Sequence, residues 1–295
     1  MNKIEAIEKV KSVREYMKKA LSREDHQLVL SLLERPYPLE DEGNVEFLFR
    51  EDGEKVAELL DGVAGYSGRM IEAPHYLVVL SRAEGVDYRR AGFIAQSIIL
   101  RLMQEGIGTC WVSVESSDVV KEKLQLETDK EVAALIALGY PRETGFFEKF
   151  FSGIKASRSP YSETGYADFR FEYEKDTRQP VGTGTFIYID NWGNVADADE
   201  LERRGYLEVY HYMKYAPSWG NRRPWRFILQ NFDIVMAVQR MAETEQLADH
   251  LEGGIAMYFF QLAMHEMGIR GYWLMDAQAE VPDNYFLAGK YVSDK

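Results

Sequence analysis

Two cations and a hydroxyl group lie within four residues near the start of the chain, in the stretch KSVREY at residues 11–16. Lys11, Ser12 and Arg14 could together bind a phosphate group, because all three side chains donate hydrogen bonds to phosphate oxygens. The spacing of the apolar residues around them predicts a helix over residues 3–20. A solvated helix face is the alternative interpretation of the same three residues.

Two other stretches combine glycine, polar and aromatic residues. In GIGTCWVSV, at residues 106–114, two glycines precede an extended segment whose backbone could approach a flat ring closely. In PSWGN, Ser218 and Asn221 offer hydrogen-bond donors and acceptors, while Pro217 and Trp219 offer flat apolar contact. A turn that ends a helix and packs its tryptophan is the alternative interpretation of PSWGN.

Several familiar motifs of catalysis and nucleotide binding do not occur in the sequence. No G-x-G-x-x-G follows a strand, and there is no P-loop and no G-x-S-x-G nucleophile elbow. Five scattered histidines and one cysteine disfavour a metal site. Any chemistry is therefore expected to belong to an organic cofactor.

Composition restricts the partners and the compartment. The chain of 295 residues has a net charge of -13, which argues against nucleic acid and anionic membranes as partners. No run of about 18 apolar residues is present, so no membrane-spanning helix is expected. The first residues lack the apolar stretch of a secretory signal. A single cysteine allows no internal disulfide, and together these features predict a cytoplasmic protein.

Helical and strand patterns alternate along the chain. Apolar periodicity and capping residues predict further helices over residues 24–34, 54–61, 88–106, 116–126, 198–215 and 250–268. Compact apolar runs predict strands over residues 44–49, 73–80, 108–114, 131–141, 186–190, 225–230, 269–275 and 284–292.

The two halves of the chain repeat one pattern. Residues 91–112 align with residues 253–274, and the alignment places Gly92 on Gly254, Gly106 on Gly268 and Trp111 on Trp273. Any two helix-to-strand units look alike to some degree, but the shared Gly-Ile-x-x-x-Trp frame favours an internal duplication. We therefore expect an α+β fold with two related lobes, each with an antiparallel sheet flanked by helices. The irregular stretch 142–182 contains the boundary, giving domains 1–165 and 166–295.

Taken together, these stretches resemble the nitroreductase family of flavin enzymes. That family has a basic-Ser-x-Arg segment, an A-P-S-x-x-N-x-Q-P-W-R-F stretch, an A-P strand, a helix leading into G-[LI]-G-T-x-W and a G-Y-P strand. The matching pieces here are KSVREY (11–16), APSWGNRRPWRFI (216–228), APHYLVV (73–79), GIGTCWV (106–112) and ALGYP (137–141).

The order of these pieces differs from the family pattern. The A-P-S-x-x-N stretch of the family follows the basic segment by about thirty residues, whereas here it lies in the second half, and RPYPLEDEGN stands at residues 35–44. The family is a dimer that binds FMN at its interface, so the resemblance implies a fused pseudo-dimer that acts as a monomer. The acidic stretch where a second basic segment would lie implies one flavin per chain.

The resemblance also implies roles for individual residues. Lys11, Ser12 and Arg14 would bind the FMN phosphate, and Arg69 would face the pyrimidine edge of the flavin. Lys155 and Arg158, which follow the G-Y-P strand, match a second phosphate clamp less securely. The segment that lines one face of the ring comprises Trp111, Val112, Ser113 and Val114. The opposite lobe contributes Pro217, Ser218, Trp219 and Asn221.

The activity implied by the resemblance is FMN-dependent oxidation of NAD(P)H, coupled to reduction of a small acceptor such as a nitroaromatic or a quinone. No catalytic side chain is needed, because protons can come from water. A non-catalytic flavin-binding protein or sensor is the main alternative, and an interaction protein that kept only the fold is a weaker one. Arg223 replaces the family glutamine, either to tune the flavin or select an anionic substrate, or as a surface replacement.

Overall fold

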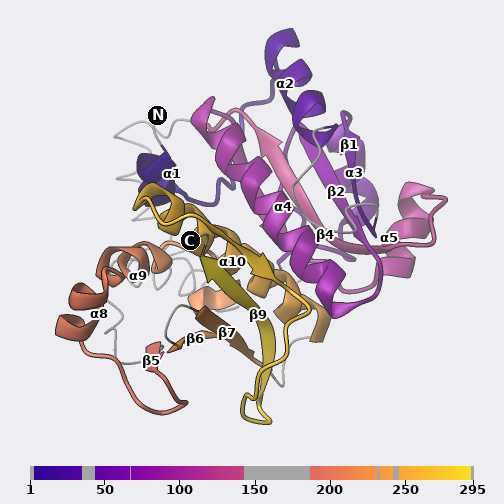
Figure 1. Ribbon diagram of the computed structural model, residues 1–295. Coiled ribbons are helices and arrows are strands. Elements are labelled where there is room, and N and C mark those ends of the chain that lie inside the picture. Colours follow the sequence, from indigo (N-terminus) through magenta and orange to yellow (C-terminus); the bar gives the residue numbers. More distant parts are fainter. Residues whose placement is uncertain are drawn as a thin grey trace, which may run out of the picture.

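The computed structural model contains two β-sheets, each packed against helices, with the long helices α4 and α10 between them (Figure 1). It describes residues 3–34, 44–66, 68–142, 187–230, 233–241 and 246–293. The α+β class and the two lobes are therefore confirmed. The boundary expected at residue 165 lies outside the described residues. None of the helices in these ranges is both long and apolar enough to cross a membrane.

The first sheet is antiparallel throughout, in the order β1-β2-β4-β3. Its strands are β1 (Val45–Arg50), β2 (His75–Ser81), β3 (Gly108–Val112) and β4 (Glu131–Gly139). Side chains alternate between its faces, so Val78 joins one apolar cluster and Val79 another. The helices of this lobe are α2 (Arg23–Leu33), α3 (Gly53–Leu60), α4 (Gly85–Gln104) and α5 (Ser117–Leu124).

The second sheet repeats that order with one strand added at its edge. Its order is β5-β6-β7-β9-β8, in which β6, β7, β9 and β8 take the places of β1, β2, β4 and β3. The strands are β5 (Ile187–Ile189), β6 (Trp225–Gln230), β7 (Asp233–Gln239), β8 (Gly271–Leu274) and β9 (Tyr285–Ser293). The added β5 pairs with β6 in parallel, which departs from the expectation of purely antiparallel sheets. The strand β7 was missed by the sequence analysis, although its run IVMAV is apolar throughout.

The two lobes meet where α4 crosses α10 (Gln246–Glu266). The contacts at this crossing are reciprocal. A Cβ added at Gly92 would lie 2.1 Å from the carbonyl oxygen of Leu251, and one at Gly254 would lie 1.9 Å from that of Arg89. Only glycine allows backbones to approach this closely. Because Gly92 and Gly254 are also aligned in sequence, the crossing relates the two halves by an approximate twofold axis.

The expected helix over residues 3–20 is wrong beyond its first turns, because α1 (Lys3–Lys9) ends at Lys9. After it, the backbone amides of Val13 and Met17 donate to the carbonyls of Thr109 and Tyr140 in the first lobe. These edge contacts replace the hydrogen bonds of a continued helix. Ile7 of α1 is fully buried in the core of the second lobe, so the start of the chain packs against both lobes.

The expected helix over residues 198–215 is interrupted by Gly205. It forms α8 (Ala198–Arg204) and α9 (Leu207–Met213). Gly205 adopts a left-handed φ of 78° and donates to the carbonyl of Glu202, while Tyr206 donates to that of Leu201. This pattern ends a helix and favours glycine. The helical periodicity on both sides concealed the break.

Candidate functional site

The segment after α1 places the first candidate residues beside β3. The Val13 amide donates to the carbonyl oxygen of Thr109 at 2.8 Å, which fixes the segment against the strand. Ser12 lies near Cys110 and acts to lower the pKa of its thiol, and the Arg14 guanidinium carbon lies 5.4 Å from the ring centre of Tyr66. Lys11 is exposed. The three predicted phosphate-binding residues therefore lie together, on extended chain and not on a helix.

A glycine-rich loop, which contains Gly62, Gly65 and Gly68, binds to Ser113 directly after β3. Gly65 donates its amide to the Ser113 carbonyl oxygen at 2.9 Å, and the Ser113 hydroxyl donates to the Gly65 carbonyl oxygen at 2.8 Å. Tyr66 and Arg69 then exchange backbone hydrogen bonds, which turns the chain and exposes the Arg69 side chain. The same loop thus carries both Gly65, which pairs with Ser113, and Arg69.

The remaining candidates of the first lobe follow along β3 and just beyond it. Val112 is fully buried, and Val114 forms an isolated bridge with Ala64 of the glycine-rich loop. The Trp111 indole donates to the side-chain oxygen of Gln96 at 3.2 Å, and it packs against the clusters of both lobes. The strand end therefore lies close to the junction between the lobes.

Arg14 carries the positive charge in the cluster that it forms with Cys110 and Tyr66, because burial keeps those two groups neutral. Burial raises the pKa of the Cys110 thiol and of the Tyr66 hydroxyl, and Arg14 partly opposes both shifts. Both groups therefore stay neutral near pH 7, next to a guanidinium that is always protonated. A cation beside neutral donors suits an anionic ligand. Within the described ranges, no group of three or more His, Cys, Asp or Glu could hold a metal ion.

The Pro217–Asn221 turn presents its aromatic and polar groups together. Trp219 is 49% exposed, and the turn continues as a short 3₁₀ segment, η4 (Trp219–Asn221). Asn221 and Arg223 adopt left-handed φ values of 55° and 49°. The Ser218 hydroxyl oxygen accepts the Arg223 amide at 3.0 Å, and the Arg223 guanidinium donates to the Lys214 carbonyl oxygen at 2.9 Å. Arg223 thus links the turn to the end of the preceding helix α9.

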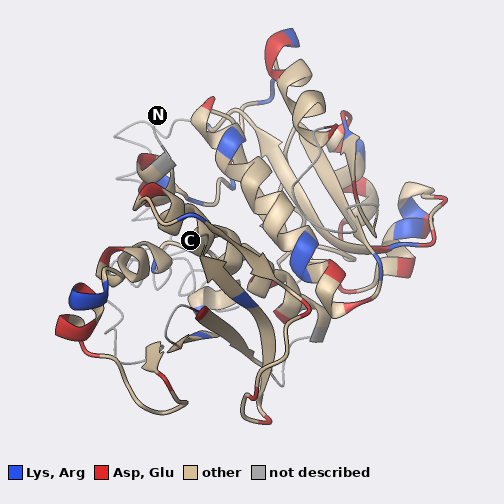
Figure 2. Ribbon diagram, in the orientation of Figure 1, with Lys and Arg blue, Asp and Glu red and all other residues tan. Residues whose placement is uncertain are grey.

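A buried carboxylate of α10 also holds this turn. The Trp219 amide donates to Oε1 of Glu252 at 2.5 Å. Glu252 is 9% exposed, and burial raises its pKa to about 7 against the lowering effects of the Trp219 amide and Arg222. The middle of α10 that follows Glu252 is free of charged residues (Figure 2).

The structure forms two groups from the predicted site residues. One lies along β3 and just beyond it, and the other lies in the Pro217–Asn221 turn, which α10 anchors. Lys155 and Arg158 lie outside the described residues. The sequence analysis missed Tyr66 and Glu252 as members of these groups. Glu252 was detectable as an acidic residue that opens a long apolar stretch of helix.

Two titratable residues on α10 are expected to give the free energy of unfolding opposite pH dependences. Burial, with Arg89 and Arg240 nearby, lowers the pKa of His250 to about 3, so its contribution is complete above about pH 6.5 and is lost as the pH falls. The raised pKa of Glu252 makes its contribution complete below about pH 4.5 and lost as the pH rises through about 7. Between pH 4 and 8 each limb should amount to about 3 kcal/mol.

Urea unfolding between pH 4 and 8 measures both limbs. His250→Gln should flatten the acid limb alone, and Glu252→Gln the alkaline limb alone. If both variants kept the wild-type pH profile, the assignment of the limbs would be wrong.

Comparison with known proteins places the chain in a family. The family model described as "Putative TM nitroreductase" matches residues 2–168, more than half of the chain. The structure of a "putative nitroreductase" from Thermotoga maritima superposes with a TM-score of 0.57 at 18% identity, covering 99% of this chain and 93% of that one. At this identity the likeness shows the fold. No curated protein matches the chain.

Structures of smaller proteins align with about half of the chain. An FMN-dependent nitroreductase from Clostridium difficile has 22% identity and a TM-score of 0.42, covering 48% of this chain and 88% of that one. A nitroreductase with bound FMN from Bacteroides fragilis has 18% identity and a TM-score of 0.41, covering 50% and 92%. The family model matches more than half of this chain, which shows that the chain belongs to the nitroreductase family described as "Putative TM nitroreductase".

Proposed function

We propose that the protein is an FMN-dependent oxidoreductase that uses NAD(P)H to reduce small acceptors such as nitroaromatics and quinones. The observation that carries the proposal is that Ser12 and Arg14 lie beside β3 and the neighbouring Tyr66, in a chain of a nitroreductase family. Three segments distant in sequence thus supply a cation, hydroxyl groups and strand backbone along β3 and just beyond it. This is the donor set that a phosphorylated, planar cofactor needs.

The Pro217–Asn221 turn, the second group of site residues, also fits such a cofactor. The side-chain amide nitrogen of Asn221 is buried and has no hydrogen-bond partner among the described residues. A buried donor of this kind is uncommon without a partner, because it loses its hydrogen bonds to water. A flavin ring carries acceptor atoms along its edge that could satisfy it. The exposed Trp219 beside it offers a flat apolar surface.

Each group has a defined task in this proposal. FMN, when bound, supplies two-electron transfer between NAD(P)H and the acceptor. Lys11, Ser12 and Arg14 bind its phosphate, with Lys155 and Arg158 as the second clamp. Arg69 stabilises negative charge at the ring edge. The segment Trp111–Val114 lines one face of the ring, and the Pro217–Asn221 turn lines the other.

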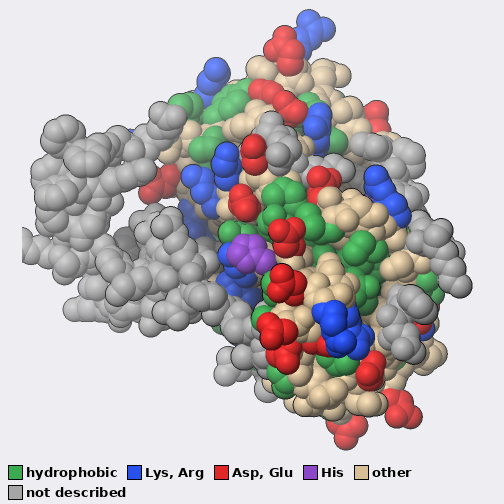
Figure 3. Space-filling view, turned by 60° about the vertical axis from the view of Figure 1, so that its left-hand side comes forward, with side chains coloured by type: hydrophobic (Ala, Val, Ile, Leu, Met, Phe, Trp, Pro, Cys, Tyr) green, Lys and Arg blue, Asp and Glu red, His purple; other side chains and the backbone are tan. Residues whose placement is uncertain are grey.

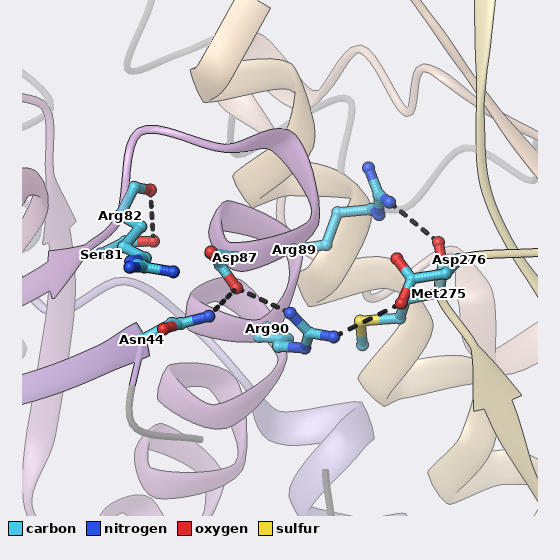
Figure 4. A network of polar contacts seen from close by, with 8 residues as sticks. All are labelled: Asn44, Ser81, Arg82, Asp87, Arg89, Arg90, Met275 and Asp276. Atoms are coloured by element: carbon cyan, nitrogen blue, oxygen red, sulfur yellow. Dashed lines mark hydrogen bonds and ion pairs between the residues drawn. The ribbon is translucent and has the colours of Figure 1, made fainter. Parts of the chain in front are cut away.

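We further propose that one chain is a pseudo-dimer with a single flavin site. The twofold relation places Met275 and Asp276 where Ser113 and Val114 stand in the first lobe. There the Arg89 guanidinium donates to the Met275 carbonyl oxygen at 3.0 Å, and Arg90 lies 3.7 Å from the Asp276 carboxylate (Figure 4). Arg89 and Arg90 are both buried, so they fill the second position with protein side chains.

The division into lobes 1–165 and 166–295 and a cytoplasmic location remain parts of this proposal. The net charge of -13 supports a protein that acts on small molecules without nucleic acid or membrane partners. On the face drawn in Figure 3, acidic side chains lie among the basic ones, with hydrophobic patches between them. A surface of this kind does not form the basic stripe that nucleic acid requires.

The absorption spectrum of the purified protein tests the function. We expect a yellow protein whose flavin bands are bleached anaerobically by NADH or NADPH and restored by a quinone. Flavin bands that NAD(P)H leaves unchanged would favour a non-catalytic flavin-binding protein. Complete failure to bind added FMN would overturn the cofactor assignment.

Titration of the apoprotein with FMN tests the single site. Fluorescence quenching should reach its end point at one FMN per chain, because Arg89 and Arg90 occupy the second position. An end point at two FMN per chain would contradict the asymmetric pseudo-dimer. Sedimentation of the same sample would show whether that second site arose from association of two chains.

A further inference from the structure

The backbone of the Pro217–Asn221 turn is unfavourable without support. Gly220, Asn221 and Arg223 all have φ between 49° and 57°, and two of these three are not glycine. Left-handed backbone at residues with a Cβ persists where surrounding contacts enforce it. The groups that hold this turn therefore determine where Ser218 and Asn221 lie.

The contacts within the turn do not attach it to the rest of the fold. The Asn221 amide donates to the Ser218 carbonyl oxygen at 3.0 Å, and the Arg223 amide donates to the Ser218 hydroxyl. Arg222 stacks on Trp219, with its guanidinium carbon 4.5 Å from the ring centre. These partners belong to residues 218–223 and shape the turn, while the Arg223 guanidinium links it to the Lys214 carbonyl oxygen at the end of α9.

Glu252 makes the attachment to α10. Its Oε1 accepts the Trp219 amide at 2.5 Å from a helix that forms the centre of the molecule. A carboxylate acceptor gives a short and strong hydrogen bond. Within the described part of the chain its second oxygen, Oε2, is buried without a hydrogen-bond partner, so the carboxylate is held at the turn although its burial is unfavourable.

The duplication shows that the fold itself does not require a carboxylate there. The twofold relation places Glu252 of α10 at the position of Arg90 in α4. Arg90 donates to Asp87 at 2.7 Å within its own helix. The same position therefore carries opposite charges in the two lobes, and the carboxylate occurs in the lobe that contains the PSWGN turn.

We infer that Glu252 is a positioning residue for the flavin site, which holds the Trp219 amide and thereby orients Ser218 and Asn221 toward the cofactor. This inference rests on the proposed function, but its first part concerns the protein without ligand. The anchoring of the turn and its effect on flavin binding are therefore measured separately.

Hydrogen exchange of the Trp219 amide in the apoprotein tests the anchoring at pH 8, where the Glu252 carboxylate is mostly ionised. Glu252→Ala should speed exchange at least about tenfold, and Glu252→Gln, which keeps an acceptor oxygen, should speed it less. Asp249→Asn is the matched control, because Asp249 is a buried acid of the same helix that accepts the amide of Met241 instead. It should leave Trp219 exchange unchanged. Unchanged exchange in Glu252→Ala would overturn the inference.

Flavin binding tests the second part. Glu252→Ala should raise the Kd for FMN about tenfold, whereas Glu252→Gln should raise it less and Asp249→Asn should leave it within about twofold. Faster exchange with an unaltered Kd would overturn the positioning role. Faster exchange in a protein whose wild-type form binds no FMN would refute the proposed function and leave Glu252 as the anchor of the turn. Circular dichroism of each variant confirms that it is folded.

Discussion

Gly254→Ala is expected to destabilise the protein by about 3 kcal/mol or more, because the new methyl group would lie 1.9 Å from the carbonyl oxygen of Arg89. A backbone carbonyl inside a helix cannot swing away as a side chain can. The two helices would have to separate along the crossing that joins the lobes. Gly92→Ala should have a similar effect, since its methyl group would lie 2.1 Å from the carbonyl oxygen of Leu251. Urea unfolding measures both changes.

Gly253→Ala is the control for the crossing, because Gly253 adjoins Gly254 in the same helix. Its added Cβ would meet Val238 at 3.4 Å, which is ordinary van der Waals contact. Alanine is favoured over glycine within helices by about 1 kcal/mol, so this variant should be neutral or more stable. Equal stability of the Gly253 and Gly254 variants would show that the crossing is not tightly packed.

The sequence predicted those elements whose local pattern and tertiary role agree. The helices α4 and α10 and the shared Gly-Ile-x-x-x-Trp frame are confirmed at their expected places, and Gly106 and Gly268 end the two helices with φ of 83° and 81°. Glycine at this position is demanded by the left-handed backbone that follows a helix. Such signals are local, so a single sequence reveals them.

The predictions that failed concern elements whose structure depends on contacts between distant residues. The spacing of apolar residues continues past Lys9, yet Val10 packs in the core of the second lobe while Val13 packs in that of the first. The two residues follow one helical spacing in the sequence, although their side chains pack in different lobes. A helix was therefore expected where the chain in fact leaves one lobe and runs along the edge of the other.

The candidate site could be predicted in part for the same reason. The family motifs identified the residue types, and the structure places Ser12 and Arg14 beside β3, with Ser113 directly after that strand. The partner of the PSWGN turn could not be found this way, because Glu252 is 33 residues from Trp219 and lies on another element. Only the course of the chain brings them together.

Beyond what the sequence predicted, the main feature of the structure is the asymmetry between equivalent positions of the two lobes. Arg90 and Glu252 occupy equivalent places, and Arg89 with His250 joins the lobes by a hydrogen bond of 2.7 Å. His250 accepts this bond at Nδ1 as a neutral imidazole, which agrees with the lowered pKa. One lobe junction is thus occupied by protein contacts, while the other retains the donors that suit a cofactor. In the proposed pseudo-dimer, duplication of the fold has been followed by specialisation of its two interfaces.

Arg14→Ala is expected to raise the Kd for FMN by about 10- to 100-fold, because it removes a charged donor whose hydrogen bond to phosphate contributes about 1.5–3 kcal/mol. Arg14→Lys should recover part of this affinity, since an ammonium keeps the charge but lacks the planar fork of donors. Fluorescence titration of FMN into each apoprotein gives the values, and riboflavin provides a second probe. Because riboflavin has no phosphate, Arg14→Ala should change its affinity little.

Arg142→Ala separates a site effect from a general change in charge. Arg142 is exposed and follows β4, and its backbone amide, which the substitution retains, donates to the carbonyl oxygen of Glu15. Its loss lowers the net charge as much as the loss of Arg14 does, so it should change the Kd for FMN by less than about twofold through screened, long-range attraction alone. Equal losses in the two variants, or an equal loss for riboflavin and FMN in Arg14→Ala, would contradict the assignment of Arg14 to the phosphate. A large and phosphate-dependent loss confined to Arg14 would place the anionic end of the cofactor beside β3, where Ser12 and Tyr66 both lie near Cys110.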